Sequence, residues 1–297
     1  MVIGKFIAIM SKKIYVGLAQ WHHNQWRFNK SLSQPLQQYS NVFSTVEGNT
    51  SFYGVPSEQN IKAWDRDTSQ MFKFCFKFPR EISHKLKLSH CSRQVSEFLN
   101  RISMLNDKLG VVWLQLDQYC DATSLPKIIS FMQQLPDSFD YAVEVRNLDY
   151  YKKDVLEQRF NGFLQRNNIN RVIFDTRSLF AQQKDLTASF DEATIKAFKA
   201  KPRVPTHVIN TGQHPFVRII IPMQIELGLY VIEQWVIKIA QWLNEGLVPY
   251  VFFHTPDNAL APEFAQLFCE KLAALVADID LIVLDNAEEE GAQSDLF

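Results

Sequence analysis

Short apolar segments recur along the chain, and each one ends in one or two polar side chains before a polar loop begins. These segments predict eight β-strands, at residues 12–18, 43–49, 72–78, 109–116, 140–146, 170–176, 215–221 and 248–254. Apolar residues at helical spacing between them predict amphipathic helices, at Glu58–Arg66, Arg93–Leu105, Leu125–Gln134, Val155–Arg166, Glu226–Leu243 and Glu263–Leu275.

The alternation of strands and helices predicts a single α/β domain over residues 11–280, folded as a (β/α)8 TIM-type barrel. Such barrels need about 250 residues, and the units found here repeat at suitable intervals. A doubly wound open sheet is the competing fold, but it often carries a glycine-rich phosphate loop after its first strand. The first strand here continues into Gly17-Leu18-Ala19-Gln20-Trp21, which lacks that pattern. Residues 177–214 are interpreted as a sixth unit with an extended excursion.

The amino-acid composition limits the kinds of partner that the protein is expected to bind. The chain has 297 residues, of which 46% are hydrophobic, so it can bury a substantial core. Its formal net charge is −1, so no overall basic field exists to hold duplex nucleic acid or a membrane surface. Any anion must therefore be bound by a local group of cations.

The cysteines and the first residues predict a cytoplasmic protein. Cys75, Cys91, Cys120 and Cys269 are scattered without metal-type spacing, which fits a reducing compartment. The segment before Met10 is too short and too interrupted for a secretory or membrane segment. Met10-Ser11-Lys12-Lys13 has the character of a natural start, so residues 1–9 are interpreted as an upstream artefact.

The polar side chains at the strand ends are the main candidates for chemistry. Alternate residues of a barrel strand point inward, and active sites lie at the carboxyl ends of the strands. Period-two phasing then directs a set of polar residues toward one rim: Glu47, Asn49, Lys77, Gln115, Glu144, Arg146, Asp175, Arg218 and His254. A purely structural ion-pair network is the alternative, with Lys77 paired to Glu144 or Glu47 and Arg146 paired to Asp175. Trp21 and Trp26 follow the first strand and would contribute an aromatic wall, although ordinary loop packing is the commoner outcome.

Several of these segments together resemble the YecE-like family of unknown function, UPF0759. The resemblance covers about residues 14–265 and rests on Trp21 and Trp26, on Val46–Tyr53, on Phe76–Arg80 with Ser83-His84, on Leu109-Gly110 with Leu114–Leu116, and on Val143–Arg146. It implies a TIM-type barrel and no established reaction, and it adds Tyr53 to the substrate-binding candidates. Gly17-Leu18-Ala19, Ile219-Ile220-Ile221 and His254-Thr255 depart from the usual pattern of this family.

The first functional hypothesis is an enzyme without a redox cofactor that acts on a small anionic or phosphorylated substrate. Arg146, with Lys77 or Arg218, would hold the anion through charge-assisted hydrogen bonds. Glu144 or Glu47 would act as general base, with Asp175 as a further catalytic candidate. Lys77 could alternatively form a Schiff base, because a lysine on a barrel strand is desolvated and well positioned.

Two other classes of function stay open. A metal-assisted hydrolase or nuclease-like enzyme would use Glu47, Glu144, Asp175 and His254 as ligands of a divalent metal, although Lys77 and Arg146 would repel the ion. The acidic tail over residues 285–297 ends in Gln293-Ser294-Asp295-Leu296-Phe297, which resembles the peptide that binds bacterial DNA sliding clamps. Gln293, Leu296 and Phe297 would be the anchors, and the barrel would then bind a nucleotide or a nucleic-acid end without catalysis.

Overall fold

A computed structural model describes residues 11–26, 34–181, 192–223 and 225–281. The predictions for residues 1–9 and for the tail over 285–297, including Gln293, Leu296 and Phe297, lie outside the described residues. Within the described part, no helix is both long and apolar enough to cross a membrane.

Eight parallel strands close into a barrel, which confirms the predicted fold. The closure is made by β2 and β9, whose registers pair Tyr15 with Tyr250 and Leu18 with Phe253. The barrel strands are β2 (Tyr15–Leu18), β3 (Thr45–Gly48), β4 (Lys73–Lys77), β5 (Leu109–Gln115), β6 (Tyr141–Glu144), β7 (Asn170–Asp175), β8 (Phe216–Ile220) and β9 (Tyr250–His254).

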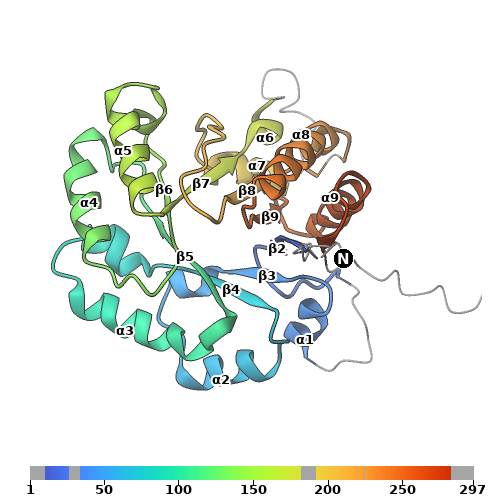
Figure 1. Cartoon of the computed structure of the whole chain (residues 1–297), viewed down its shortest axis with the longest axis horizontal. Coiled ribbons are helices and arrows are strands. Elements are labelled where there is room, and N and C mark those ends of the chain that lie inside the picture. Colours follow the sequence, from blue (N-terminus) through green and yellow to red (C-terminus); the bar gives the residue numbers. More distant parts are fainter. Residues whose placement is uncertain (1–10, 27–33, 182–191, 224, 282–297) are drawn as a thin grey trace, which may run out of the picture.

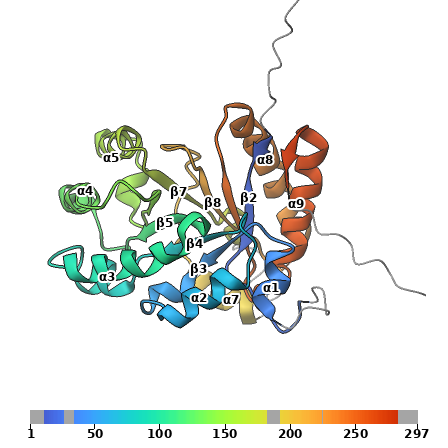
Figure 2. The same cartoon turned by 60° about the horizontal axis from the view of Figure 1, so that its bottom comes forward.

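Most of the helices surround the strands on the outside of the barrel, as Figures 1 and 2 show. They are α1 (Pro35–Ser40), α2 (Glu58–Arg66), α3 (Ser92–Ile102), α4 (Leu125–Gln133), α5 (Val155–Arg166), α6 (Arg177–Phe180), α7 (Glu192–Ala200), α8 (Ile225–Asn244) and α9 (Ala261–Leu275). The predictions for α2 and α5 match at both ends. Ser57 explains the start of α2, because its hydroxyl accepts a hydrogen bond from the backbone N–H of Asn60 at 3.1 Å.

Some elements were not predicted. The structure places α6 and α7 within the excursion over 177–214, and α1 follows the first strand. The predicted first strand divides into β1 (Lys12–Lys13) and β2, and β1 pairs with the short β10 (Ile279–Asp280) in a separate small sheet. These pieces are short, so they carry little periodic signal.

Two layers of apolar side chains hold the barrel. Cys75, Trp113, Ala142 and Phe252 belong to a cluster that fills the barrel interior, and all four are fully buried. The Phe side chains of β4 lie on the opposite face and pack against the helices. Because the side chains alternate along β4, Lys73, Cys75 and Lys77 share the inner face, as the phasing predicted.

Gly17 permits close packing between β2 and β3. A Cβ atom at this position would lie 2.1 Å from the carbonyl oxygen of Thr45, so a larger residue could not be accommodated without displacing the backbone. The same two strands carry Leu18 and Val46 in register directly below the rim.

Candidate active site at the mouth of the barrel

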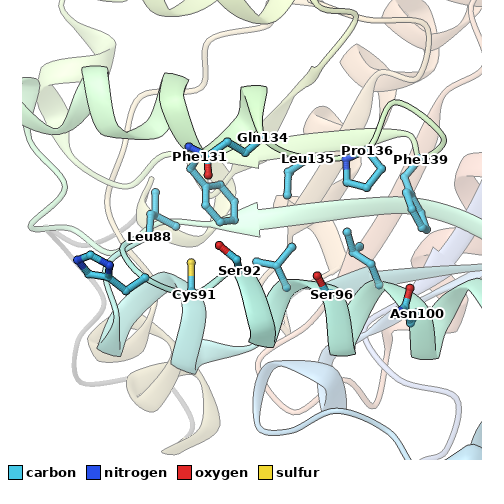
Figure 3. A pocket seen from close by; sticks show the side chains of 13 residues that line it. Leu88, Cys91, Ser92, Ser96, Asn100, Phe131, Gln134, Leu135, Pro136 and Phe139 are labelled. Atoms are coloured by element: carbon cyan, nitrogen blue, oxygen red, sulfur yellow. The ribbon is translucent and has the colours of Figure 1, made fainter.

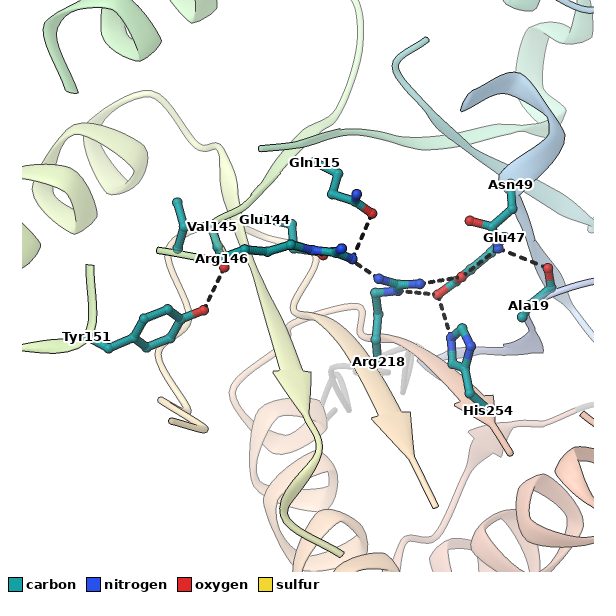
Figure 4. A network of polar contacts seen from close by, with 10 residues as sticks. All are labelled: Ala19, Glu47, Asn49, Gln115, Glu144, Val145, Arg146, Tyr151, Arg218 and His254. Carbon is teal, nitrogen blue, oxygen red and sulfur yellow. Dashed lines mark hydrogen bonds and ion pairs between the residues drawn. The ribbon is translucent and has the colours of Figure 1, made fainter. Parts of the chain in front are cut away.

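Arg218 is the centre of a buried polar network at the carboxyl ends of the strands (Figure 4). Its Nε and Nη2 atoms donate to the carboxylate of Glu47 at 2.6 and 3.0 Å, and its Nη1 donates to Glu144 at 2.7 Å. One guanidinium therefore joins β8 to β3 and to β6 across the barrel. The expectation that Lys77 would pair with one of these carboxylates is corrected, because Arg218 bonds to both.

Arg146 completes the network on the side of β6. Its Nε donates to the second oxygen of Glu144 at 2.6 Å, and its Nη2 donates to the side-chain oxygen of Gln115 at 2.9 Å. Arg146 lies beyond the end of β6, and its side chain is 21% exposed, whereas Glu144 is 1% exposed. It is thus the arginine of the network that an incoming ligand can reach.

The remaining partners of Glu47 are His254 and Asn49. Nε2 of His254 lies 3.0 Å from Oε1 of Glu47, and Nδ2 of Asn49 donates to Oε2 at 3.0 Å. The Asn49 amide also donates to the carbonyl of Ala19, which ties the loop after β2 to the network. His254 and Arg218 both take part, although His254 is itself a departure from the family pattern and Arg218 precedes one at Ile219.

The network holds its carboxylates ionised. Burial alone would raise the pKa of Glu144, but Arg146, Arg218 and Lys77 outweigh it and bring the pKa to about 2. Burial likewise acts against ionisation of Glu47, and Arg218 and His254 keep its pKa well below the usual range. Burial lowers the pKa of His254 to about 4 in spite of Glu47 beside it, so this imidazole is neutral at pH 7.

Lys77 has a different environment from the two arginines. Its Nζ lies 4.9 Å from the ring centre of Phe52 and 5.3 Å from that of Trp113, and the side chain is buried. Within the described residues this ammonium has no hydrogen bond or ion pair. Burial, followed by the charge of Arg218, lowers the pKa of Lys77 to about 7, so a large fraction is the free amine at neutral pH.

Hydrogen bonds of Ser51 hold Phe52 in place beside Lys77. Its hydroxyl lies 2.7 Å from the carbonyl oxygens of both Gly48 and Lys77, and it accepts from the backbone N–H of Lys77 at 3.1 Å. Ser51 lies in the 3-10 helix η1 (Asn49–Phe52), so this anchoring positions the adjacent Phe52 against Lys77.

Lys201 belongs to the same site and was missed by sequence reasoning. It follows α7, and it lies close enough to Arg218, Glu47, Arg146 and Glu144 to interact with their charges. Burial lowers the pKa of Lys201 to about 8. The sequence gives no periodic signal for Lys201, because it lies in a loop after a helix that was not predicted.

Asp175 does not join this network. Its carboxylate accepts hydrogen bonds from Nη2 of Arg177 and Nε1 of Trp235, both at 2.8 Å, and from Thr206 at 3.1 Å. The neighbouring Phe174 faces inward, where its ring centre lies 5.2 Å from the guanidinium of Arg218. Asp175 therefore points toward α8 on the outside of the barrel, and the expected pairing with Arg146 is wrong.

The predicted aromatic wall is dispersed. Trp21 makes an edge contact with Trp64 of α2 at 5.5 Å between ring centres, and the indole N–H of Trp26 donates to the carbonyls of Asn258 and Ala259. Both tryptophans thus engage in loop packing. Tyr53 lies on the rim, 85% exposed, with its ring against Phe52.

Within the described residues, no group of three or more His, Cys, Asp or Glu side chains is placed to hold one metal ion. Glu47 and His254 are adjacent, but Arg218 lies against the same carboxylate, and Asp175 lies elsewhere. The metal-assisted reaction stays a prediction without support from this geometry.

A pocket of about 270 Å³ lies away from the network, between α3 and α4 (Figure 3). Its lining is mixed: apolar side chains such as Leu99, Phe131 and Phe139 lie beside the polar side chains of His90, Ser92, Ser96, Asn100 and Gln134. None of the predicted site residues lines this pocket, so it is separate from the network at the barrel mouth.

Comparisons with known proteins agree with the fold. The chain is 37% identical to the UPF0759 protein YecE of Escherichia coli strain K12 over 269 residues, which cover 91% of this chain and 96% of the relative. It is 38% identical to the UPF0759 protein YunF of Bacillus subtilis over 66 residues, which cover 22% of this chain and 23% of that protein.

Solved structures of DUF72 family proteins share the same architecture. One from Thermotoga maritima superimposes with a TM-score of 0.62 at 19% identity, covering 88% of this chain and 99% of that one. One from Enterococcus faecalis gives a TM-score of 0.59 at 17% identity, covering 87% and 95%. The family model described as "Protein of unknown function DUF72" matches residues 15–288. The chain therefore belongs to the DUF72 family, within the YecE-like UPF0759 group.

Proposed function

We propose that this protein is an enzyme that acts on a small anionic carbonyl compound through the amine of Lys77, without a redox cofactor. The observation that carries the proposal is the position of the Lys77 ammonium, buried at the barrel mouth against two aromatic rings and without an ion-pair partner in the described chain. Burying an unpaired charge is unfavourable, so such a lysine indicates use in chemistry.

Lys77 suits proton transfer or nucleophilic attack better than the carboxylates do. Both oxygens of Glu144 and both oxygens of Glu47 accept hydrogen bonds from cationic or polar neighbours. A carboxylate with a pKa of about 2, as for Glu144, is a weak base at neutral pH. A lysine with a pKa of about 7 supplies free amine, the form that attacks a carbonyl carbon.

The charges around Lys77 favour an anionic substrate. Four of the described basic side chains, Arg146, Arg218, Lys77 and Lys201, surround the carboxylates of Glu47 and Glu144. The arginines balance the carboxylates, and the two lysines add positive charge whenever they are protonated. Arg146 is partly exposed and can offer a carboxylate or phosphate group its remaining N–H donors.

The proposal predicts a site-specific imine. Reduction with borohydride in the presence of glyoxylate, a small anionic aldehyde, should attach a carboxymethyl group to Lys77, as measured by peptide mass spectrometry. A lysine with the ordinary pKa is free amine in about one molecule of a few thousand at pH 7. The yield at Lys77 should therefore exceed that at exposed Lys62 and should rise as the pH passes about 7.

Lys77→Arg is the matched variant, because it keeps a positive charge and cannot form the imine. Lys62→Arg is the control at an exposed position of α2. Labelling spread over exposed lysines, with none at Lys77 in the unsubstituted protein, would refute the proposal.

A further inference from the structure

The irregular segment that follows β4 carries His84, whose ring contacts the same Phe52 ring as the Lys77 ammonium. Residues Glu81–Lys85 form the π-helix η2, a rare conformation found frequently at functional sites. Lys87, Leu88 and His90 follow it with φ values of 48°, 62° and 50°. Left-handed backbone at residues other than glycine is strained, and such strain clusters at active sites. His84 lies within η2.

The contacts of His84 place its imidazole against Phe52, the aromatic ring that also lies beside the Lys77 ammonium. Nδ1 of His84 lies 2.8 Å from the hydroxyl of Ser83, which is fully buried. The imidazole meets the ring of Phe52 edge-on, 5.2 Å between centres at an interplanar angle of 82°. The Lys77 ammonium lies 4.9 Å from the centre of the same Phe52 ring. Phe52 therefore contacts both an amine and an imidazole.

The Ser83 hydrogen bond leaves Nε2 of His84 as the imidazole atom available to a ligand. Nε2 has no hydrogen-bond or ion-pair partner among the described residues, and the side chain is half-buried. The charged groups that act on this imidazole are Asp117, Arg80, Arg146 and Lys77. Burial lowers the pKa of His84, and the three cations reinforce that shift against Asp117. The ring is therefore neutral at pH 7 and can accept a proton.

We infer that His84 is the proton-transfer residue of this site, which acts on the ligand beside Lys77 through Nε2. The inference rests on the proposed function, in which Lys77 is the amine. It explains why a strained, irregular segment is placed directly after the strand that carries that lysine.

The step assigned to His84 is the conversion of the first adduct into the imine. The Lys77 nitrogen bonds to the carbonyl carbon, and the electron pair of the C=O π bond moves to oxygen. His84 takes the proton from the new ammonium nitrogen and delivers it to that oxygen, which then leaves as water once a second proton has been added from solvent. The nitrogen lone pair forms the C=N bond, so the products are a protonated imine and one water molecule.

The test measures how fast glyoxylate reacts at Lys77, by quenching with borohydride at timed intervals and quantifying the Lys77 peptide. His84→Asn should slow the reaction by about 100-fold, since general acid–base groups typically contribute factors of that order. The change of rate with pH that comes from titration of the His84 imidazole should also be absent in His84→Asn. His90→Asn is the matched control, because His90 is exposed in the same segment and lines the pocket between α3 and α4.

A second variant separates proton transfer from structural support. Added imidazole should restore part of the rate in His84→Ala, which a purely structural role would not allow. Unchanged rate and pH profile in His84→Asn, or failure of imidazole to restore His84→Ala, would overturn this inference. If the unsubstituted protein forms no adduct at Lys77, the proposed function fails first, and the role of His84 fails with it.

Discussion

Arg218→Met should lower the free energy of unfolding by about 3–5 kcal/mol at pH 7, the typical effect of breaking a buried ion pair. Arg218 donates three hydrogen bonds to Glu47 and Glu144, and the side chains of all three residues are at most 4% exposed. Without the guanidinium, the described partners left to Glu47 are His254 and Asn49, and Glu144 keeps Arg146. Two carboxylates would then be buried with too little positive charge.

The loss of stability in Arg218→Met should depend on pH, and the direction of that dependence can be checked. In the unsubstituted protein both carboxylates have folded pKa values below their unfolded values, so their stabilising contribution is present above about pH 4.3. It is lost as the pH falls toward the folded pKa, about 2 for Glu144. Loss of Arg218 raises the folded pKa values of both carboxylates, so they take up protons at a higher pH and the buried charge is removed. The difference in the free energy of unfolding between the variant and the unsubstituted protein should therefore shrink below about pH 5.

Urea unfolding at pH 7 and at pH 4.5 measures this difference. Arg66→Met is the control, because Arg66 is 72% exposed and pairs with Asp67 at the surface. A surface pair of this kind contributes about 0–1 kcal/mol. If Arg218→Met lowers the free energy of unfolding no more than Arg66→Met does, the guanidinium of Arg218 does not hold the network together.

Lys77→Met should have the opposite effect and stabilise the protein by about 2–4 kcal/mol at pH 6–7. Folding lowers the pKa of Lys77 from about 10.4 to about 7, and each unit corresponds to about 1.4 kcal/mol. The cost of burying the ammonium is fully present below about pH 7. It declines as the pH rises toward the unfolded pKa, where the lysine is neutral in both states. Methionine has a similar length and packs well against aromatic rings such as Phe52 and Trp113.

Thermal and urea unfolding at pH 6.5 and at pH 10.5 would measure the gain, which should be much smaller at the higher pH. Lys62→Met, on an exposed face of α2, should change stability by less than about 1 kcal/mol. A protein that becomes both more stable and unreactive when Lys77 is replaced has kept an unfavourable residue for its chemistry. Destabilisation of Lys77→Met at both pH values would indicate a structural lysine instead.

Period-two phasing predicted most members of the polar network because side chains alternate along these short strands. Lys77 and Glu144 are the last residues of β4 and β6, and fully buried inner neighbours such as Cys75 and Ala142 fix the phase of each strand. The same reasoning failed at Asp175. Barrel strands are buried on both faces, so Val172-Ile173-Phe174 is apolar throughout and carries no phase.

The groups that sequence reasoning missed lie outside the strands. His84 belongs to a π-helix and entered the sequence reasoning only as a landmark of the family resemblance, and Lys201 follows a helix within a segment interpreted as irregular. Their positions depend on how loops return to the rim, which hydrophobic periodicity does not encode. Arg177 was missed for a similar reason, because its pairing with Asp175 depends on the outward direction of that carboxylate.

A direct titration of the Lys77 amine is the decisive measurement. Protein labelled with carbon-13 at the lysine ε position gives one NMR signal for each lysine, and Lys77→Arg assigns the signal of interest. We expect that signal to titrate with a midpoint near pH 7, several units below the lysines on the surface. A midpoint near 10.4, like that of an ordinary exposed lysine, would contradict the assignment of Lys77 as the reactive amine of this barrel.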